Sequence, residues 1–500
     1  MPAGFTASDF YYILPELVLA GGALLVLVAD ILFPRREGLL FSLTLATLAA
    51  TGLVLFSFAG IDVTVSRGLL AIDGFALFFK VIFVASAALT VLTSPSYLRV
   101  EDAHSGAYYF LILCATLGMM FMASGIDLIT LFIGLETMAI SFYVLAGYLK
   151  PNRRSNEAAV KYFLLGAFST GILLYGMSLL YGASGATHLN EIADALAGQE
   201  RNPSVVLALI LVAAGMGFKI AAVPFHMWAP DVYEGAPTPV AGYLSVGSKA
   251  ASFAMLLRIL VEGLPADMVP DWQLIFYALA VLTMTVGNIA AITQSNVKRM
   301  LAYSSIAHAG YILIGVVAAT ERGVAAALVY LWVYLFMQLG AFAIVTMLRR
   351  RDIIGDELKD MSGLYFRNPG AAFAMLVFML SLGGLPPTAG FMGKVWVFGA
   401  AIEAGQNPLN SLGVWLVWLA VIGVVNSAIS LFYYIRVIVF MWMKEETLGS
   451  AVRLGPAMAV ALTVAVIGSI LFGVYPQLLF EQAQTAAATL GSTVSTVALQ

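Results

Sequence analysis

The chain consists largely of apolar segments about 20 residues long, a few of which contain a lysine or a glutamate. Segments of this length cross the hydrocarbon core of a bilayer as α-helices, and in lipid every backbone polar group needs a partner within the protein. With 61% hydrophobic and 11% charged residues, the composition lies far outside the range of soluble domains. The sequence therefore predicts an all-α membrane protein with many crossings.

The apolar segments predict fourteen transmembrane helices within one polytopic membrane domain, residues 1–500. Their approximate ranges are 11–33, 39–60, 72–93, 107–123, 126–148, 157–181, 204–229, 237–262, 273–294, 299–318, 324–348, 369–402, 412–442 and 455–478. No Lys or Arg precedes the first helix, so we expect it to be retained and not cleaved as a signal peptide.

Basic residues gather in alternate connections between the predicted helices. Connections after even-numbered helices contain only Arg67, Arg201 and Arg322. Those after odd-numbered helices contain fifteen: Arg35, Arg36, Arg99, Lys150, Arg153, Arg154, Lys298, Arg299, Arg349, Arg350, Arg351, Lys359, Arg367, Lys444 and Arg453. The positive-inside rule then places the odd-numbered connections in the cytoplasm and both chain ends on the opposite side.

Several ionisable side chains fall inside the apolar segments. They are Lys80, Glu136, Lys161, Lys219, Lys249 and Lys394. A charge at the bilayer centre costs about 2.5–3.5 kcal/mol on insertion scales, and such residues usually mark ion paths or proton relays. Lysine suits a relay because its ammonium releases a proton when desolvated, which arginine practically never does. Arg258 and Arg436 lie nearer helix ends, where we expect them to snorkel.

Two predicted helices contain helix-breaking residues beside a lysine. Pro224 follows Lys219 by five residues, and Pro386 and Pro387 precede Lys394 in a glycine-rich stretch. Proline removes a backbone donor and crowds the carbonyl four residues earlier. Backbone groups freed at membrane depth need protein or water partners, so such breaks tend to line polar cavities. We expect helices 7 and 12 to be discontinuous.

The spacing of polar residues is consistent with an internal repeat. From Glu136 to Lys219 is 83 residues, and from His308 to Lys394 is 86. If helices 4–8 and 9–13 form two five-helix units, the odd number of crossings inverts the second, as in transporters with paired broken helices. The chain would then divide into residues 1–105 with helices 1–3, a first repeat at 106–263, a second at 270–443, and helix 14 with the tail at 444–500.

Several function classes lack support in the sequence. No glycine-rich nucleotide fingerprint follows a predicted strand, and the four histidines and Cys114 give no spacing for a metal, haem or iron–sulfur site. The balance of 25 basic and 28 acidic residues provides no basic surface for nucleic acid. We expect no cofactor and no metal in this chain, no nucleic-acid partner, and the lipid bilayer as a partner.

Three stretches resemble a known family closely. They are Lys219–Val240, which includes Pro-Phe-His-Met-Trp-Ala-Pro-Asp-Val-Tyr-Glu-Gly-Ala-Pro-Thr-Pro and is followed by Ser248-Lys249, then Asn296–His308, and Pro386–Phe391. The chain resembles, over nearly its whole length, the subunit N family of the bacterial proton-pumping NADH:quinone oxidoreductase, respiratory complex I. That family belongs to the antiporter-like membrane subunits.

The resemblance implies a proton-translocating subunit, a translocase without a redox site of its own, driven by quinone reduction elsewhere in the complex. Glu136 is similar to the family's acid that pairs with the helix 7 lysine, here Lys219. Lys249 is similar to the lysine that passes protons onward, and Lys394 to the terminal residue at the exit. Further candidates for the relay are Lys161, His226, His308 and Tyr303.

The resemblance also implies where the other components of the reaction lie. NADH, FMN, the iron–sulfur clusters and quinone would be bound by partner subunits. The neighbours of this chain would be sibling antiporter-like subunits and small membrane subunits. The location would be the bacterial inner (plasma) membrane, with both termini periplasmic.

Structural roles remain open for most of these residues. Glu136 and Lys219 are also consistent with a buried ion pair that only fixes helix register. Lys161 follows Glu157 by four residues, the spacing of a helix surface pair, and Lys80 is compatible with a lysine at a helix interface. The histidines are compatible with buried neutral side chains. For the whole protein, a cation/proton antiporter subunit and a non-conducting scaffold subunit remain alternatives.

Overall fold

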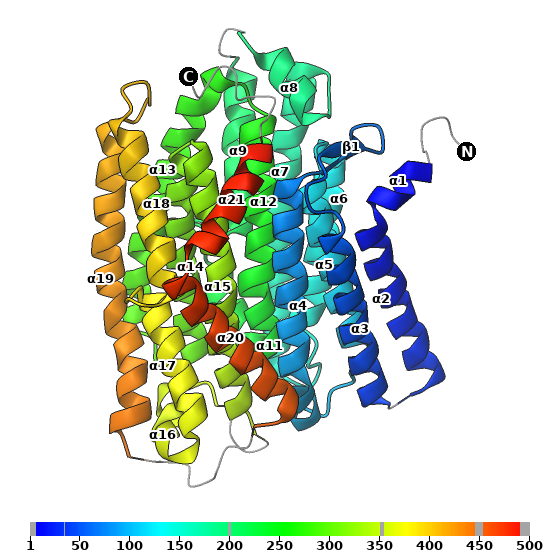
Figure 1. The fold of residues 1–500 in the computed structure, drawn as a ribbon, viewed down its shortest axis with the longest axis vertical. Helices are drawn as coiled ribbons and strands as arrows, with labels where there is room; N and C mark the ends of the chain where they lie inside the picture. Colours follow the sequence, from blue (N-terminus) through cyan, green and yellow to red (C-terminus); the bar gives the residue numbers. More distant parts are fainter. Residues whose placement is uncertain (1–6, 35, 199–201, 351–354, 446–453, 491–500) are drawn as a thin grey trace.

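The computed structural model describes residues 7–34, 36–198, 202–350, 355–445 and 454–490. Its helices form one bundle in which most long axes run in a common direction (Figure 1). Twelve spans are long and apolar enough to cross a membrane. They are α2 (Leu14–Leu32), α3 (Glu37–Phe56), α4 (Gly74–Val100), α5 (Gly106–Ser124), α6 (Leu128–Ala146), α7 (Arg153–Ser184), Thr238–Glu262, Ala266–Ile292, α14 (Val297–Val317), α15 (Glu321–Leu348), α19 (Val414–Met443) and α20 (Pro456–Val474).

Two further crossings are broken where the prolines predict a break. The first consists of α9 (Pro203–Lys219) and α10 (Trp228–Gly235), and the second of α17 (Pro369–Gly383) and α18 (Ala389–Gln406). The connecting segments contain cis peptide bonds, Val223–Pro224 and Pro386–Pro387. With the twelve continuous spans these pairs give the predicted fourteen-helix plan, and the discontinuity of helices 7 and 12 is confirmed.

Many of these helices begin at a side chain that caps their first turn. Asp73 accepts from the Ala76 N–H, Asp127 from the Ile129 and Thr130 N–H groups, and Asn368 from the Ala371 N–H. Such caps satisfy backbone donors that have no partner inside the helix. Asp127 sets the boundary within the crowded pair α5–α6, and Asn296, which accepts from the Arg299 N–H, sets the one between α13 (Val269–Ile292) and α14, where the apolar pattern alone is almost continuous.

The connections contain elements that hydropathy does not predict. Strands β1 (Val63–Val65) and β2 (Leu70–Ile72) form an antiparallel hairpin between α3 and α4, so the fold is not purely helical. Short helices α1 (Ala7–Tyr12), α8 (Leu189–Leu196), α16 (Leu364–Arg367), η2 (Ala266–Met268) and η3 (Leu358–Met361) lie in other connections. A further helix, α21 (Gln477–Thr489), follows α20, and the Thr489 hydroxyl accepts from the Phe75 N–H at 3.0 Å.

Burial separates a central group of helices from an outer ring. The span Thr238–Glu262 comprises α11 (Thr238–Tyr243), η1 (Leu244–Ser248) and α12 (Lys249–Glu262). In this span, in α14 and in α15, 94% of an 18-residue apolar stretch is buried. In α3 only 28% is buried, and in α20 only 33%. The central helices therefore contact protein on all sides, whereas the outer ones present apolar side chains suited to lipid or to other membrane proteins.

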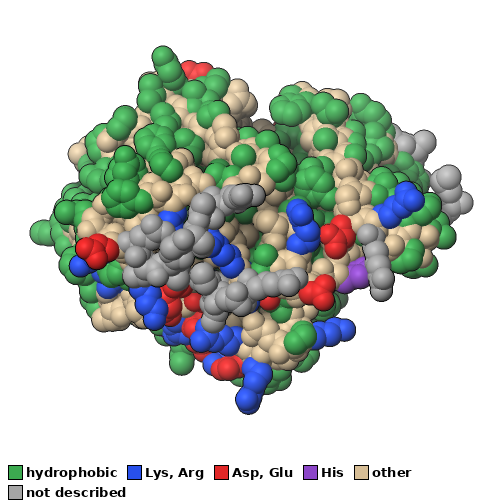
Figure 2. All heavy atoms as spheres, turned by 90° about the horizontal axis from the view of Figure 1, so that it is seen from below, with side chains coloured by type: hydrophobic (Ala, Val, Ile, Leu, Met, Phe, Trp, Pro, Cys, Tyr) green, Lys and Arg blue, Asp and Glu red, His purple; other side chains and the backbone are tan. Residues whose placement is uncertain are grey.

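Lys and Arg side chains gather on one end of the bundle (Figure 2). The first and last described helices, α1 and α21, extend toward the other end (Figure 1). This arrangement has the asymmetry that the positive-inside rule requires, and the direction of insertion remains a prediction. Of the basic residues counted from the sequence, Arg35, Arg201, Arg351 and Arg453 lie outside the described residues.

Corresponding contacts recur 169 positions apart. Asp127 forms an isolated antiparallel bridge with His188, and Asn296 (127 + 169) forms one with Glu357. A Cβ atom on Gly118 would lie 2.5 Å from the Met138 nitrogen, and one on Gly287 (118 + 169) would lie 2.8 Å from the nitrogen of Ala307 (138 + 169). We propose from these pairs that residues 106–263 and 270–443 are the two inverted five-helix units.

The matching contacts at Gly118 and Gly287 predict that substitutions at these two positions lower stability to a similar extent. Gly118→Val and Gly287→Val each place side-chain atoms where a facing backbone lies, so each variant is expected to lose roughly 1–3 kcal/mol of stability or more. Gly171→Val is the control, because nothing lies within 4 Å of a Cβ atom there. Thermal unfolding of the purified complex measures the loss, and wild-type stability of either variant would contradict the close approach.

Candidate functional site

Lys219 ends the first half of a broken helix and is buried without a partner. Its side chain is 5% exposed and forms no hydrogen bond or ion pair with the described residues. Glu136, on α6, is close enough to act on it electrostatically, yet the Glu136 Oε1 atom is also buried and unpartnered. The two groups predicted to pair are thus brought to one region and left unpaired.

Other polar atoms near Glu136 are unpartnered too. The Tyr143 hydroxyl on α6 and the Thr170 hydroxyl on α7 are buried close to each other, neither forms a hydrogen bond of normal geometry among the described residues, and Tyr143 is within electrostatic range of Glu136. Buried polar groups without protein partners usually hold ordered water. The region between α6, α7 and α9 therefore offers the polar groups that a water path from Glu136 to Lys219 needs.

Side chains from α10 and α13 satisfy the backbone of this first break. The Trp228 indole Nε1 donates to the Phe218 carbonyl oxygen at 2.9 Å, and the Val223 N–H donates to the Thr283 hydroxyl at 2.9 Å. The Trp228 ring also stacks on Tyr162, with the ring centres 4.7 Å apart. These contacts supply the protein partners that an interrupted helix requires within a membrane.

Lys249 lies at the start of α12, in the buried centre of the bundle. Its side chain is 2% exposed, and the ammonium donates to the Ser305 hydroxyl at 2.6 Å and to the Ser305 carbonyl oxygen. The ammonium also lies 5.6 Å from the centre of the Tyr334 ring. Neutral oxygens and a ring face thus hold this lysine, without an ion pair to any described carboxylate.

His308 contacts two tyrosine hydroxyls in the buried centre of the bundle. The imidazole Nδ1 lies 2.7 Å from the Tyr330 hydroxyl and Nε2 lies 3.1 Å from the Tyr434 hydroxyl, which in turn lies 2.5 Å from the Ser304 hydroxyl. The ring is 1% exposed and within electrostatic range of both lysines. Ser304 is the chain neighbour of Ser305, so the contacts of Lys249 and those of His308 meet at adjacent positions of α14, although no hydrogen bond among the described residues joins the two serines.

Lys394 lies just after the second break, and the broken backbone holds its ammonium. The Nζ atom donates to the carbonyl oxygens of Leu382 at 3.0 Å and Gly383 at 2.9 Å, and to the Ser427 hydroxyl at 2.8 Å. The two carbonyls end α17, where the helix dipole favours a cation. Gly384 has a φ of +80°, and a Cβ atom there would lie 2.7 Å from Lys394 Cδ, so this position requires glycine.

Lys161 belongs to a network of charges at the basic end of the bundle. Its ammonium contacts Glu157 at 2.8 Å, as the four-residue spacing predicts, and also Asp231 at 2.6 Å. Arg299 contacts Asp231 at 2.7 Å and Glu234 at 2.9 Å. A cavity of about 170 Å³ lies among Arg154, Glu157, Ala158, Asp231, Glu234, Gly235 and Arg299.

Two other buried cations have carboxylate partners. Lys80 forms a 2.7 Å ion pair with Glu16, which makes it a lysine at the interface of α4 and α2. Arg258 is 0% exposed, contacts Asp73 at 2.7 Å and Glu262 at 2.6 Å, and donates to the Ala123 carbonyl at 3.1 Å. The expectation that Arg258 snorkels is therefore wrong, because two carboxylates compensate the charge in place of water.

The remaining predicted candidates differ in their surroundings. His226 lies in the first break with a buried Nδ1 that has no hydrogen bond among the described residues. Arg436 donates to the Ile292 carbonyl at the end of α13 and to the Gln294 carbonyl just beyond it. The Tyr303 hydroxyl has no hydrogen bond among the described residues. The hydroxyls that contact His308 belong instead to Tyr330 and Tyr434, whose only signal in the sequence is a tyrosine inside an apolar segment.

The fold and the site together define an antiporter-like membrane subunit, with two broken helices and a series of buried lysines. Residues 125–429 match the family described as NADH:quinone oxidoreductase/Mrp antiporter, TM. The chain belongs to the NADH-quinone oxidoreductase subunit N family. It is 47% identical to NADH-quinone oxidoreductase subunit N 1 of Koribacter versatilis (95% of each chain) and 45% identical to subunit N of Trichlorobacter lovleyi (96% of this chain, 98% of the relative).

Solved structures share the fold. A chain of respiratory complex I from Thermus thermophilus, with bound aureothin, is 33% identical with a TM-score of 0.77, over 93% of this chain and 98% of that one. A chain of the Mrp complex from a Dietzia species is 21% identical with a TM-score of 0.83, over 98% of this chain and 99% of that one, a likeness of fold alone. Among the described residues, no group of His, Cys, Asp and Glu side chains is arranged to hold a metal ion.

The Arg258 cluster gives a prediction about stability. Arg258→Met removes the guanidinium that contacts the buried Asp73 and Glu262 carboxylates, so we expect a loss of about 3–5 kcal/mol. The combined variant Arg258→Met, Asp73→Asn, Glu262→Gln is expected to recover part of that loss in thermal unfolding of the purified complex. Arg322→Met, which breaks a solvent-exposed pair with Glu403, is the control and should change little. An unchanged unfolding temperature in Arg258→Met would show that the cluster does not stabilise the bundle.

Proposed function

We propose that this chain conducts protons across the membrane as a subunit of an NADH:quinone oxidoreductase. One observation carries the proposal: Lys219, Lys249 and Lys394 are each 5% exposed or less, and none forms an ion pair with a described carboxylate. Burying an ammonium without a carboxylate is costly, and lysine can relieve that cost by releasing its proton. Three such lysines in one bundle are better suited to proton transfer than to stability.

Polar contacts around Lys249 and His308 support a route for the proton. Lys249 donates to Ser305, and the neighbouring Ser304 contacts Tyr434, which contacts His308. On this proposal, water completes the step between the two serines. Hydroxyl and imidazole groups both accept and donate protons, so they can pass a proton on without net movement of the chain. His308 lies within electrostatic range of Lys394, the last member of the proposed relay.

The proposed cycle begins at the first break. A proton from the cytoplasm loads Lys219, passes through Lys249, His308 and water to Lys394, and leaves on the far side when Glu136 and Lys219 pair again. The separation of Glu136 from Lys219 in this structure corresponds to the unpaired stage of that cycle. Each proton moved against the membrane potential requires about 2.3 kcal/mol per 100 mV. We propose that this energy comes from partner subunits, which bind NADH, FMN, iron–sulfur clusters and quinone.

The position of Glu136 also supports a neighbouring subunit. The α6 helix that carries it exposes Ile129, Ile133, Ile140 and Val144. A carboxylate beside such a surface is unfavourable against lipid, so we propose that another antiporter-like or small membrane subunit covers this face. The host would be the bacterial plasma membrane, with the basic end of the bundle in the cytoplasm and both termini periplasmic.

Replacement of Lys219 tests the function. In inverted membrane vesicles, Lys219→Ala should abolish most NADH-driven acidification while NADH oxidation by an artificial acceptor and the amount of assembled complex hold. Lys219→Arg should be equally defective, because arginine keeps the charge but does not release the proton. Lys150→Ala, at an exposed lysine in a connection, is the matched control.

The other outcomes identify the alternatives. Normal acidification in both Lys219 variants would contradict the relay and favour a scaffold subunit. Acidification that persists without NADH and requires sodium or potassium would favour a cation/proton exchanger.

Replacement of Tyr434 tests the route. Tyr434→Phe removes the hydroxyl that contacts both His308 and Ser304, and we expect NADH-driven acidification to fall on the order of tenfold or more. Tyr303→Phe is the control, since its hydroxyl has no hydrogen bond among the described residues. Equal effects of the two variants, measured at equal amounts of assembled complex, would exclude the hydroxyl route through Tyr434.

A further inference from the structure

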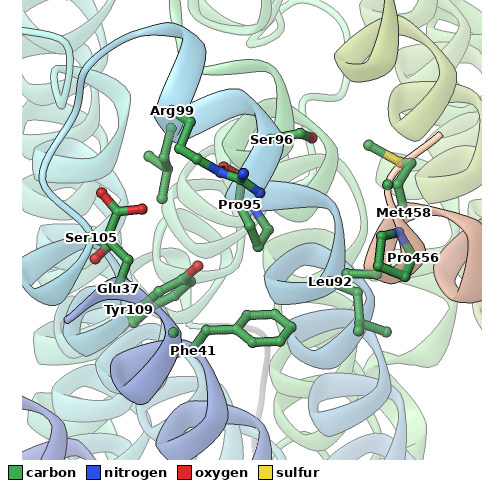
Figure 3. Close-up of a pocket in the computed structure, with 14 residues that line it drawn as sticks. Glu37, Phe41, Leu92, Pro95, Ser96, Arg99, Ser105, Tyr109, Pro456 and Met458 are labelled. Carbon is green, nitrogen blue, oxygen red and sulfur yellow. The ribbon is translucent and has the colours of Figure 1, made fainter. Parts of the chain in front are cut away.

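A cavity of about 380 Å³ opens at the basic end of the bundle, lined by residues that the proposed relay does not use. The first turns of α3, α5 and α20 and the last turns of α4 surround it. In Figure 3, Arg99, Glu37 and the Tyr109 hydroxyl lie on one side, and Leu92, Pro456 and Met458 on the other. The cavity thus has a polar and an apolar part, and its volume falls in the range of small-ligand sites.

Buried hydroxyl groups in the polar part lack partners. Tyr109 is 1% exposed and Ser105 is 5% exposed, and neither hydroxyl has a hydrogen bond with a described residue. Figure 3 shows the Tyr109 hydroxyl directed into the cavity. Both residues line the cavity, so their hydroxyl groups are open to it and can form hydrogen bonds with a ligand bound there.

The charges around this part favour an anionic group and an ammonium together. The Arg99 guanidinium donates only its Nε–H to the chain, to the Pro95 carbonyl at 3.2 Å, which leaves its terminal N–H groups available. Glu37 and Arg99 are both within electrostatic range of the Tyr109 hydroxyl. An arginine beside a glutamate matches a zwitterion, whereas the Glu37 carboxylate repels a ligand with excess negative charge.

The helix ends add to the preference for a phosphate beside Arg99. The N-cap residues of α3, α5 and α20 are Arg36, Ser105 and Gly455, and none makes a side-chain bond to its helix. By contrast, Asp73 caps α4 and Asp127 caps α6. The Gly106 N–H at the start of α5 donates to His104 Nδ1 at 3.3 Å, so the N–H groups and positive dipole ends that favour a phosphate are mainly those of α3 and α20.

We infer that this cavity binds a phospholipid whose headgroup carries both a phosphate and a primary ammonium, which is phosphatidylethanolamine. Arg99, Tyr109 and Ser105 bind the phosphate, and Glu37 binds the ammonium. Phe41, Leu92 and Met458 contact the first part of an acyl chain. The cavity lies at the ends of α3, α4, α5 and α20, and the ends of membrane-spanning helices lie at the depth of the lipid headgroups. This site does not depend on proton conduction.

Photo-crosslinking in the assembled complex tests the site. A phosphatidylethanolamine with a diazirine on one acyl chain is added to the detergent-purified complex, and the labelled peptides of this chain are mapped. We expect labelling near Phe41, Leu92 or Met458. Unlabelled phosphatidylethanolamine should compete about tenfold better than phosphatidylcholine, which lacks the ammonium N–H groups, or phosphatidylglycerol, which lacks the ammonium.

Three variants and a control separate a specific site from general lipid contact. Arg99→Gln should weaken labelling, and Glu37→Gln should remove the preference over phosphatidylcholine. Gly38→Trp should abolish labelling by filling the cavity, since nothing lies within 4 Å of a Cβ atom at Gly38. Gly21→Trp, equally free of neighbours on α2, should have no effect.

Several results would overturn the inference. Equal competition by all three lipids, or labelling unchanged in Gly38→Trp, would show ordinary bilayer lipid at this surface. Labelling absent from the assembled complex would show that a partner subunit covers the cavity. Stronger competition by phosphatidylglycerol would show an anionic-lipid site and contradict the role of Glu37.

Discussion

The structure depends on the requirement that backbone groups within a membrane have protein partners. Both breaks meet it, but in different ways. At the first break, Trp228 and Thr283 satisfy the backbone, so Lys219 is left without a partner. At the second break, the carbonyls that end α17 are satisfied by the Lys394 ammonium itself. The two buried lysines therefore differ. Lys219 is free to pair with another group, whereas Lys394 is held by the backbone carbonyls of Leu382 and Gly383.

The presence or absence of a carboxylate separates the buried cations into two groups. Lys80 and Arg258 have acidic partners at 2.7 Å and join helices that are distant in sequence, which is a structural role. Lys219, Lys249 and Lys394 have no ion pair among the described residues and contact hydroxyls, carbonyls or rings where they contact anything polar. A carboxylate fixes a proton on lysine, whereas neutral partners leave it easier to remove. The lysines of the proposed relay therefore share neutral partners, as does Lys298, which is buried near the charge network around Arg299 and donates to the Glu234 and Ala236 carbonyl oxygens at 2.7 Å.

Local patterns predicted much of this fold, and long-range contacts account for what they missed. Hydropathy and prolines are local properties, so the fourteen crossings and both breaks follow from them. Asp73 and Arg258 are 185 residues apart, and nothing in either segment indicates that they meet. The hydroxyl of Tyr434 reaches His308 across 126 residues, whereas the nearby Tyr303 reaches no partner among the described residues. The hairpin β1–β2 is too short to be distinguished by hydropathy from a connecting loop.

The ion cluster around Arg258 limits which parts of the bundle are free to move. It joins the start of α4, the end of α5 and the end of α12, and a change in its geometry would leave buried charge uncompensated. The fold alone does not decide the activity, because the Mrp chain shares it at 21% identity. Glu136 and Lys219 lie outside this cluster and have no bonds to break. On the proposed function, Glu136 and Lys219 can therefore pair and separate by side-chain rotation. The Arg258 cluster holds α12 against α4 and α5, so Lys249 on α12 keeps its contact with Ser305.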